Sequence, residues 1–249
     1  MTVGVVAALP LEAACLPAPS TRARPPEGRV AVSGPGPQRG EAAARRLAVE
    51  GVEALVSWGV AGGLDPALPA GTLILPERLH VPGEATVDAA WRSRLLGALV
   101  PRLPVSPGPL LHAEEVTGSP AIKADLFRAT GAAAVDQESG PVARVARQAG
   151  LPFVALRVVV DPARRGLPRA AQAALRPDGT LHRPGLLGAL LREPAALPGL
   201  AALGLDLRRA RATLREAGRI TGPRLGADES SAPMAGEAPA SPARVPVGG

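Results

Sequence analysis

Short apolar runs alternate with longer amphipathic segments along most of the chain. The runs are rich in Val, Leu and Ala, and this pattern is typical of strands that are buried on both faces. The predicted strands are Val3–Ala8, Arg29–Ser33, Ala54–Trp58, Thr72–Leu75, Ala132–Val135 and Phe153–Val160. Because strands and helices alternate, the sequence predicts an α/β fold with a largely parallel sheet that helices cover on both sides.

The amphipathic segments predict the helices, and composition predicts where the folded part ends. The predicted helices are Leu11–Leu16, Gln38–Glu50, Ala89–Val100, Pro120–Thr130, Gly140–Ala149, Leu186–Leu191 and Leu205–Ala217. Residues 81–109 are rich in proline, and we expect an irregular segment there around one helix. From Gly222 onward, Pro, Gly, Ser and Ala dominate, and such a segment buries too little apolar surface to offset its chain entropy. We therefore predict one domain over residues 1–221 and a disordered tail over 222–249.

Composition narrows the class of protein. The net charge is +6, but the arginines are scattered, Tyr is absent, and Phe and Trp occur twice each, so we expect no nucleic-acid partner. Lys123 is the only lysine, and the single Cys15, which we interpret as a small buried residue, excludes a disulfide framework. No segment has the length of a membrane span or the features of a signal peptide, which favours a cytoplasmic protein.

Acids and glycines follow several of the predicted strands. In open α/β sheets, ligands bind beyond the carboxyl ends of the strands. The segments at those ends are Leu9–Glu12, Ser33–Arg39, Gly59–Gly63, Gln137–Ser139 and Asp161. The turn SGPG resembles a phosphate-binding turn, and GVAGG allows a ligand to approach the backbone closely, although both segments also fit ordinary loops.

The acidic residues also have ordinary structural explanations. Glu12 at a helix start is a favourable partner of the helix dipole, and we favour a helix N-cap role for Asp136. Glu138 is equally compatible with capping and with ligand binding, and Asp161 can cap the next helix. His80, His112 and His182 lack ligand spacing, so we expect no metal site.

Together the segments VGVVAALPLEA, SGPGPQRGEAAA, SWGVAGGLDPALPAGTLILPE, AVDQES and GLPFVALRVVVDPA resemble the nucleoside phosphorylase and nucleosidase superfamily. This superfamily includes purine nucleoside phosphorylase and methylthioadenosine/S-adenosylhomocysteine nucleosidase. The resemblance covers about Thr2 to Gly222. Within the superfamily, the sequence most resembles the hopanoid-associated phosphorylases, also described as adenosylhopane nucleosidases.

The resemblance implies a three-layer α/β/α sandwich with a mixed central sheet and cleavage of an N-ribosidic bond without metal or organic cofactor. It implies that Asp161 protonates or hydrogen-bonds N7 of the purine. It also implies that Glu138 holds the ribose hydroxyls beside Gln137, and that Glu12 positions the attacking water in the hydrolytic branch. It places the backbone of Gly59, Ala61 and Gly62 against the substrate. It places inorganic phosphate, the possible co-substrate, at Gly34, Gly36 and Arg39.

The sequence departs from the pattern of the superfamily in four respects. Gln137 replaces a usual Met, Val160 replaces a Ser that orients the acid, and Val60 replaces a Ser or Thr. Arg164 and Arg165 stand where nucleosidases often carry a second Asp. These departures leave a second hypothesis open, a non-catalytic nucleoside-binding or scaffold protein.

As an enzyme, the chain is expected to release adenine from an adenosine-linked, hydrophobic substrate such as adenosylhopane. Phosphorolysis and hydrolysis both remain open. The leucine-rich segment 186–205 is a candidate for an apolar approach to the pocket or a peripheral membrane contact. By analogy with related enzymes we expect a homodimer.

Overall fold

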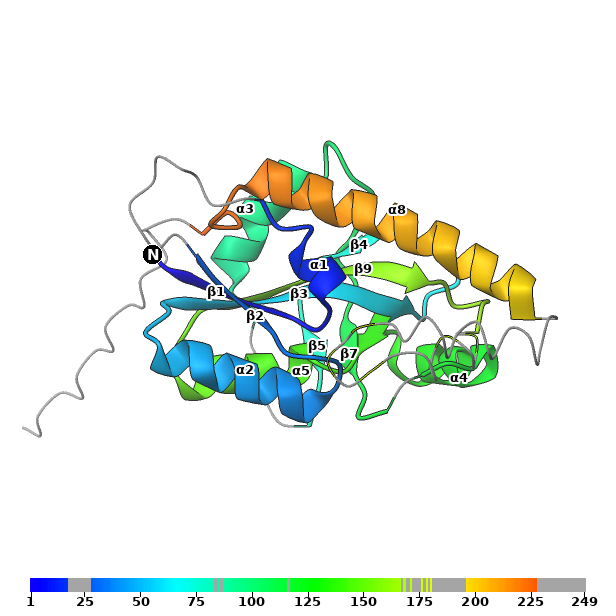
Figure 1. The fold of residues 1–249 in the computed structure, drawn as a ribbon, viewed down its shortest axis with the longest axis horizontal. Helices are drawn as coiled ribbons and strands as arrows, with labels where there is room; N and C mark the ends of the chain where they lie inside the picture. The colour runs from blue at the N-terminus through cyan, green and yellow to red at the C-terminus, as the bar shows by residue number, and fades with distance from the viewer. Residues whose placement is uncertain are drawn as a thin grey trace, which may run out of the picture.

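The structure is a computed structural model, and it describes residues 1–17, 28–82, 87–115, 117–166 and 196–227, with the single positions 85, 168, 171, 176, 178 and 180. The described elements form three layers, with a central sheet between two sets of helices (Figure 1). The predicted α/β/α sandwich with a mixed sheet is confirmed.

Two long strands form the middle of the sheet. Strand β3 (Ala54–Gly63) pairs in parallel with β9 (Phe153–Asp161) along nearly its whole length. Strand β1 (Val3–Ala7) lies parallel to the first half of β3, and β2 (Gly28–Val32) lies parallel to β1. These pairings bring the carboxyl ends of β1, β3 and β9 to one side of the sheet.

The remaining strands are short. They are β4 (Leu73–Ile74), β5 (Leu79–His80), β6 (Val105–Ser106), β7 (Leu110–His112) and β8 (Ala134–Asp136). Strand β8 pairs antiparallel with the last residues of β3, and β4 pairs antiparallel with β9, so the sheet is mixed. The irregular segment expected at 81–109 contains β6, whose two residues give too short a signal to identify from the pattern.

Helices α3 (Ala89–Leu99) and α8 (Leu197–Thr221) cover one face of the sheet, and α2 (Pro37–Val49), α4 (Pro120–Thr130) and α5 (Ser139–Gln148) cover the other (Figure 1). The short α1 (Pro10–Ala13) follows β1. Helix α8 is longer than the predicted Leu205–Ala217, and the predicted helix at 186–191 lies outside the described residues.

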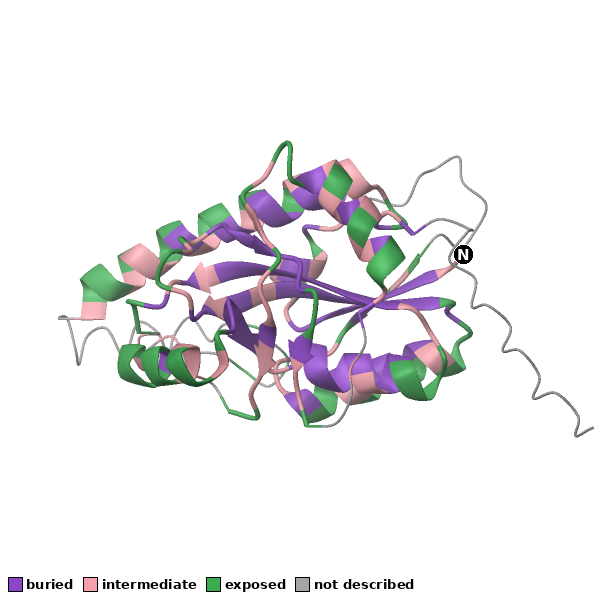
Figure 2. Ribbon diagram, turned by 180° about the vertical axis from the view of Figure 1, so that it is seen from behind, coloured by how far each residue is buried: buried purple, intermediate pink, exposed green. Residues whose placement is uncertain are grey.

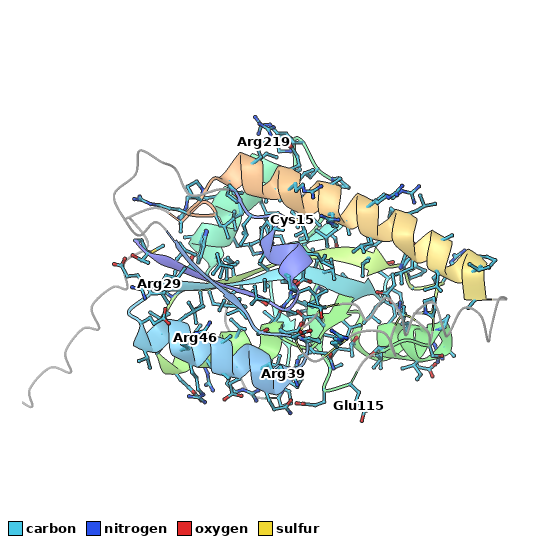
Figure 3. The ribbon with its side chains drawn as sticks, in the orientation of Figure 1. Cys15, Arg29, Arg39, Arg46, Glu115 and Arg219 are labelled. Carbon is cyan, nitrogen blue, oxygen red and sulfur yellow. The ribbon has the colours of Figure 1, made fainter. Side chains whose placement is uncertain are left out.

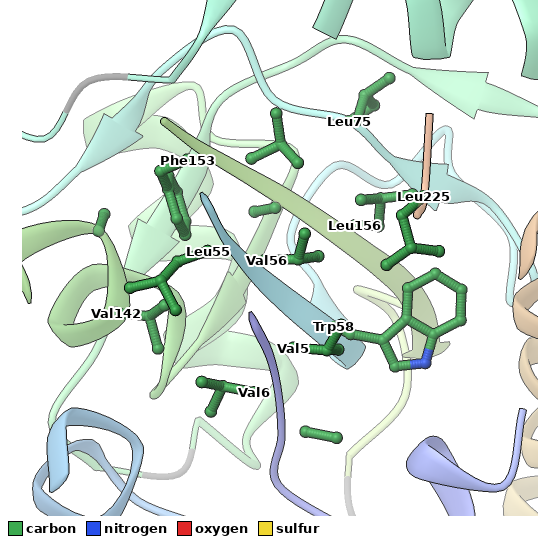
Figure 4. Packing of buried hydrophobic residues seen from close by; sticks show 14 of the residues in the cluster. Val5, Val6, Leu55, Val56, Trp58, Leu75, Val142, Phe153, Leu156 and Leu225 are labelled. Atoms are coloured by element: carbon green, nitrogen blue, oxygen red, sulfur yellow. The ribbon is translucent and has the colours of Figure 1, made fainter. Parts of the chain in front are cut away.

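The hydrophobic core lies between the sheet and both helix layers. The central strands β1, β3 and β9 are almost entirely buried, whereas the longer helices are buried mainly on the faces that contact the sheet (Figure 2). Figure 4 shows Leu55, Val56 and Trp58 of β3 packed with Phe153 and Leu156 of β9. Burial on both faces explains the continuous apolar runs of these strands.

The segment after α8 packs against α3. Leu225 and Ala227 are buried, and the indole Nε1 of Trp91 donates a hydrogen bond to the Leu225 carbonyl at 2.8 Å. The expected boundary between residues 221 and 222 falls within this packed segment, so the folded part extends at least to residue 227. The rest of the predicted tail, residues 228–249, lies outside the described residues.

Positive charge is spread over the described surface. Arg219 on α8 lies on the opposite side of the molecule from Arg39 and Arg46 on α2 (Figure 3). Several arginines pair with acids of their own helix, as Arg45 does with Glu41 at 2.7 Å. Among the described helices, none combines the length and apolar character that crossing a bilayer requires.

Candidate active site

A pocket opens at the carboxyl ends of β3, β8 and β9. It is lined by Val60, Ala61, Gly62, Glu115, Thr117, Val135, Asp136, Gln137, Glu138, Val160 and Asp161. Two carboxylates of different strand ends, Glu138 and Asp161, therefore border the same cavity. Ala61, Gly62 and Gln137, which the sequence also indicated, line it with them.

A β-bulge brings Asp161 to this pocket. Ala61 pairs with Val159, but the next residue of β3, Gly62, pairs with Asp161, so β9 contains one extra residue at this point. A regular strand points successive side chains to opposite faces, whereas both Val160 and Asp161 line the cavity. The bulge thus turns the carboxyl group of Asp161 toward the pocket.

Lys123 of α4 contacts Asp161 directly. The Lys123 ammonium donates a hydrogen bond to Asp161 Oδ2 at 2.5 Å and another to the Asp161 carbonyl at 2.8 Å. The Lys123 side chain is fully buried. Burial raises the pKa of Asp161, while the charge and hydrogen bond of Lys123 act in the opposite direction.

Arg157 of β9 occupies the centre of an acidic cluster. Its Nε lies 2.7 Å from Asp136 Oδ2, and its Nη2 lies 3.6 Å from Glu138 Oε2. Nη2 also donates to the Ser57 hydroxyl at 2.6 Å, and Nε donates to the Ser139 hydroxyl at 3.1 Å. Burial opposes the guanidinium charge, but the neighbouring acids outweigh it and raise the pKa of Arg157. The charge is therefore fixed at this position.

Asp136 is not the helix N-cap that the sequence suggested, because the N-cap residue of α5 is Glu138, but it does contact the start of that helix. Its carboxylate accepts hydrogen bonds from the Ser139 amide at 3.2 and 3.3 Å, next to the start of α5. It also forms the ion pair with Arg157. Asp136 thus joins the helix start to the charged centre of the site.

Glu138 is held by the start of another helix. Its Oε1 accepts a hydrogen bond at 2.9 Å from the amide of Gly36, the N-cap residue of α2. Burial raises the pKa of Glu138, Arg157 and the Gly36 amide lower it, and the charge of Asp136 raises it. Gly40 also lies close, because a Cβ there would come within 3.2 Å of the Glu138 Cβ.

The glycine-rich turn at 33–36 therefore already binds an anionic group of the chain itself. Gly34 and Gly36 have positive φ angles of 79° and 111°, as a tight turn requires. Arg39 Nη1 donates to the Pro35 carbonyl at 3.0 Å. Figure 3 shows Arg39 at the start of α2. Gly34, Gly36 and Arg39 are not among the residues that line the pocket.

Glu12 lies directly behind the wall of the pocket and is 1 % exposed. Its Oε1 accepts from the amide of Val60 and its Oε2 from the amide of Leu9, both at 2.8 Å. Burial raises the pKa of Glu12 to about 7, against the opposing charge of Arg157. A carboxyl group with this pKa can exchange a proton near neutral pH.

Gly59 leaves the space that Glu12 occupies. A Cβ at this position would lie 2.5 Å from the Glu12 carboxyl group, and the φ angle of Gly59 is +149°. The segment 59–63, expected to be a loop, belongs instead to β3. Gly59 therefore serves the site by accommodating Glu12, and it does not line the pocket.

The described residues contain no cluster of three or more His, Cys, Asp or Glu side chains able to hold a metal ion. His80 and His112 are described, whereas His182 is outside the described part of the chain. Cys15 is buried, as its sequence context suggested, and its thiol donates to the Leu11 carbonyl at 3.3 Å.

Two charged residues of the site, Arg157 and Lys123, were not among the sequence candidates. Each residue has an unusual sequence context, and its burial in the structure makes that context significant. Arg157 interrupts the otherwise apolar run FVALRVVV, and Lys123 is the only lysine in an arginine-rich chain. A charged side chain within a buried element needs a partner of opposite charge, but the sequence does not reveal which distant residue supplies it.

The fold and the site together define an α/β protein with buried carboxylates around a pocket at the carboxyl ends of its strands. Comparison with known families matches residues 28–177 to the phosphorylase superfamily. The chain belongs to this superfamily. No curated protein matched the sequence.

Solved structures with the same fold include two nucleosidases and a hydrolase. The 5′-methylthioadenosine/S-adenosylhomocysteine nucleosidase of Neisseria meningitidis, in complex with methylthio-immucillin-A, is 20 % identical with a TM-score of 0.57, over 65 % of this chain and 86 % of that one. The Helicobacter pylori enzyme of the same name is 18 % identical with a TM-score of 0.59, over 77 % and 98 %. Futalosine hydrolase of H. pylori is 18 % identical with a TM-score of 0.56, over 64 % and 87 %.

Proposed function

We propose that this protein hydrolyses the N-ribosidic bond of an adenosine-containing nucleoside and releases adenine. The observation that carries the proposal is that Glu138 and Asp161 line one pocket together with the segment Val60–Gly62. Family membership and the nucleosidase-like fold support the same reaction class. The adenine specificity rests on the resemblance of the sequence motifs.

Asp161 is proposed to act on the base. Cleavage of the C1′–N9 bond leaves negative charge on the departing purine, and a proton delivered to N7 stabilises that leaving group. Asp161 must be protonated to do so, and burial, which raises its pKa, supports this state. The Asp161 O–H bond breaks as the N7–H bond forms.

Glu138 is proposed to act on the sugar and Glu12 on water. An ionised Glu138 accepts hydrogen bonds from ribose hydroxyls, and its charge stabilises the positive charge that develops on the sugar. Glu12 is proposed to accept a proton from the water that attacks C1′, for which its pKa of about 7 is suited. This role requires the water to pass Val60, because Glu12 lies behind the pocket wall. Gln137, Ala61 and Gly62 would contact the bound nucleoside.

Water is the favoured acceptor because the candidate phosphate site contains a carboxylate. Glu138 binds the amide of Gly36 and brings negative charge to the turn that would hold phosphate. Arg39 donates to a backbone carbonyl of the same turn. A phosphate at Gly34, Gly36 and Arg39 would have to displace Glu138 from this amide or bear its repulsion.

The proposed test measures free adenine with and without inorganic phosphate, with methylthioadenosine, S-adenosylhomocysteine and adenosylhopane as substrates. A rate that is independent of phosphate supports hydrolysis, whereas release that requires phosphate contradicts it. A preference for adenosylhopane would support the hopanoid-associated branch. Sedimentation analysis tests the expected homodimer, and vesicle flotation tests the peripheral membrane contact.

The variant D161N is expected to reduce adenine release by at least about 100-fold, because an amide cannot protonate the base. The matched control is D125N, which removes an exposed carboxylate from α4 and should retain the rate of the wild type. Equal rates for D161N and the wild type would exclude Asp161 as the acid.

One observation favours the alternative, a nucleoside-binding protein without turnover. The ion pair with Lys123 stabilises the ionised form of Asp161, which has no proton to donate. This alternative predicts that the wild type binds adenosine in calorimetry but releases no adenine from any of the three substrates.

A further inference from the structure

Lys123 is the only residue of α4 that is buried. Its ammonium contacts four oxygen atoms of one short segment: the carbonyl and Oδ2 of Asp161, the carbonyl of Pro162 at 3.3 Å and the carbonyl of Arg165 at 3.1 Å. An ammonium group has three hydrogens to donate, so these contacts satisfy it completely. The side chain thus fastens α4 to the chain that leaves β9.

The contact with Asp161 Oδ2 is the shortest of the four. Three backbone carbonyls would be enough to satisfy a lysine whose role was only to hold α4 in place. The ammonium binds, in addition to the three carbonyls, the carboxyl group that the bulge in β9 turns toward the pocket. The preceding residue, Val160, has no hydroxyl with which to hold that carboxyl group.

We propose that Lys123 is a positioning residue for Asp161, which holds the Oδ2 atom and stabilises the carboxylate that remains after a proton has passed to the leaving base. This inference rests on the proposed function. When the Asp161 O–H bond breaks and the N7–H bond forms, a negative charge is left on a buried carboxyl group. An unpaired charge in such surroundings is costly, and the adjacent ammonium removes that cost.

The charges around Asp161 determine the pH at which it carries a proton. Lys123 is the cation in contact with it, and the charge of Asp206 on α8 acts in the opposite direction. Asp206 is itself paired with Arg165 at 2.7 Å and with Arg209 at 3.4 Å. Glu115, Asp136 and Glu138 line the same pocket as Asp161. Without Lys123, burial and the charge of Asp206 would favour the protonated form of Asp161.

The test is the pH profile of kcat/KM for adenine release in wild type, K123M and K123R. In K123M the alkaline limb should move to higher pH, because the pKa of Asp161 rises, and the maximal rate should fall by at least about 10-fold. K123R keeps the charge and should leave the limb where it is in the wild type. A K123M variant that loses rate with an unmoved limb would show that Lys123 has only a structural role and would overturn the proposal.

A double variant tests whether Lys123 acts through Asp161. In the D161N background, K123M should cause no further loss of rate, because the group that it positions is already absent. If the loss of rate in the double variant equals the product of the losses in K123M and D161N, the proposal is contradicted. Thermal unfolding of each variant establishes that the compared proteins are folded.

A third measurement needs neither a lysine variant nor activity. Because the chain contains one lysine, protein labelled with [¹⁵N]lysine gives a single side-chain ammonium signal. This signal should change position on substitution D161N and on addition of adenosine, but not on substitution D125N. If the position of the Nζ signal changes neither on substitution D161N nor on addition of adenosine, the inference is wrong, even if K123M does not fold.

The two proposals fail in different ways. If the wild type releases no base from any nucleoside, the proposed function fails, and the lysine signal still decides whether Lys123 and Asp161 are coupled. If the wild type is active and the alkaline limb of the pH profile is the same in K123M as in the wild type, only the proposed role of Lys123 fails.

Discussion

Arg157 places one guanidinium among the buried acids Asp136, Glu138 and Glu12, and its contacts hold the polar centre of the site together. Such a group is stable only while every member keeps its partners, because burial penalises each charge separately. The sequence identified the acids from their positions after strands. It could not identify the cation that joins them, since Arg157 and Asp136 lie on different strands and meet only through tertiary packing.

Glu12 should make the folding stability depend on pH. Its pKa is about 7 in the folded protein, against 4.5 for an unperturbed Glu, so the folded state binds the proton more tightly. The stabilisation is complete below pH 4.5 and is lost as pH rises through 7, a change of about 3 kcal/mol. Burial also raises the pKa of Glu138 and Asp161, and their contributions have the same sign.

Urea unfolding from pH 4.5 to 8 would measure this dependence in the wild type, in E12Q and in E41Q. The curve should be flatter in E12Q, whereas E41Q, which alters a half-buried carboxylate of α2 that pairs with Arg45, should follow the wild type. Parallel curves for E12Q and the wild type would contradict the assigned pKa of Glu12.

At the scale of elements, β3 is the strand on which the site is built. Its first half was predicted as a strand and its glycine-rich second half as a loop, because glycines usually mark turns. The strand continues to Gly63 because pairing with β9 and β8 satisfies its backbone, which local sequence cannot reveal. The bulge in β9 was equally invisible, since a single extra residue leaves the apolar run unchanged.

Gly59 should tolerate no side chain. The variant G59A would place a methyl group 2.5 Å from the Glu12 carboxyl group and would force a positive φ on alanine. We expect destabilisation by at least about 2 kcal/mol and loss of most adenine release. The matched control is G97A in α3, where a Cβ meets nothing within 4 Å and alanine should be neutral or stabilising by about 0.5–1 kcal/mol. Equal stability of G59A and G97A would contradict the close packing of Glu12.

For the whole molecule, the sequence predicted the fold class and most of the longer strands and helices. The order of strands in the sheet was not accessible from the pattern, because the pairing of β8 and β4 with the central strands depends on contacts distant in sequence. The packing of residues 222–227 was not accessible for a similar reason. The composition of the segment after α8 predicts a disordered tail, because the contact of Leu225 with Trp91 is visible only in the folded structure.

Two truncated chains test where the folded part ends. A chain ending at Thr221 loses buried Leu225 and its hydrogen bond with Trp91, and should be less stable by about 2–4 kcal/mol. A chain ending at residue 227 should match the full-length protein in denaturant unfolding if the sequence-based prediction of a tail is right. Equal losses in both truncated chains would argue against the packed segment at 222–227.

The burial of the only lysine has a consequence for proteolysis. A protease that cuts solely after lysine has one target in the entire chain, the bond between Lys123 and Ala124, near the middle of the sequence. With that side chain enclosed between α4 and the end of β9, cleavage must wait until this region opens. The rate at which two fragments of nearly equal length appear would therefore measure how fast the end of the sheet that carries the pocket opens, with no need for a label.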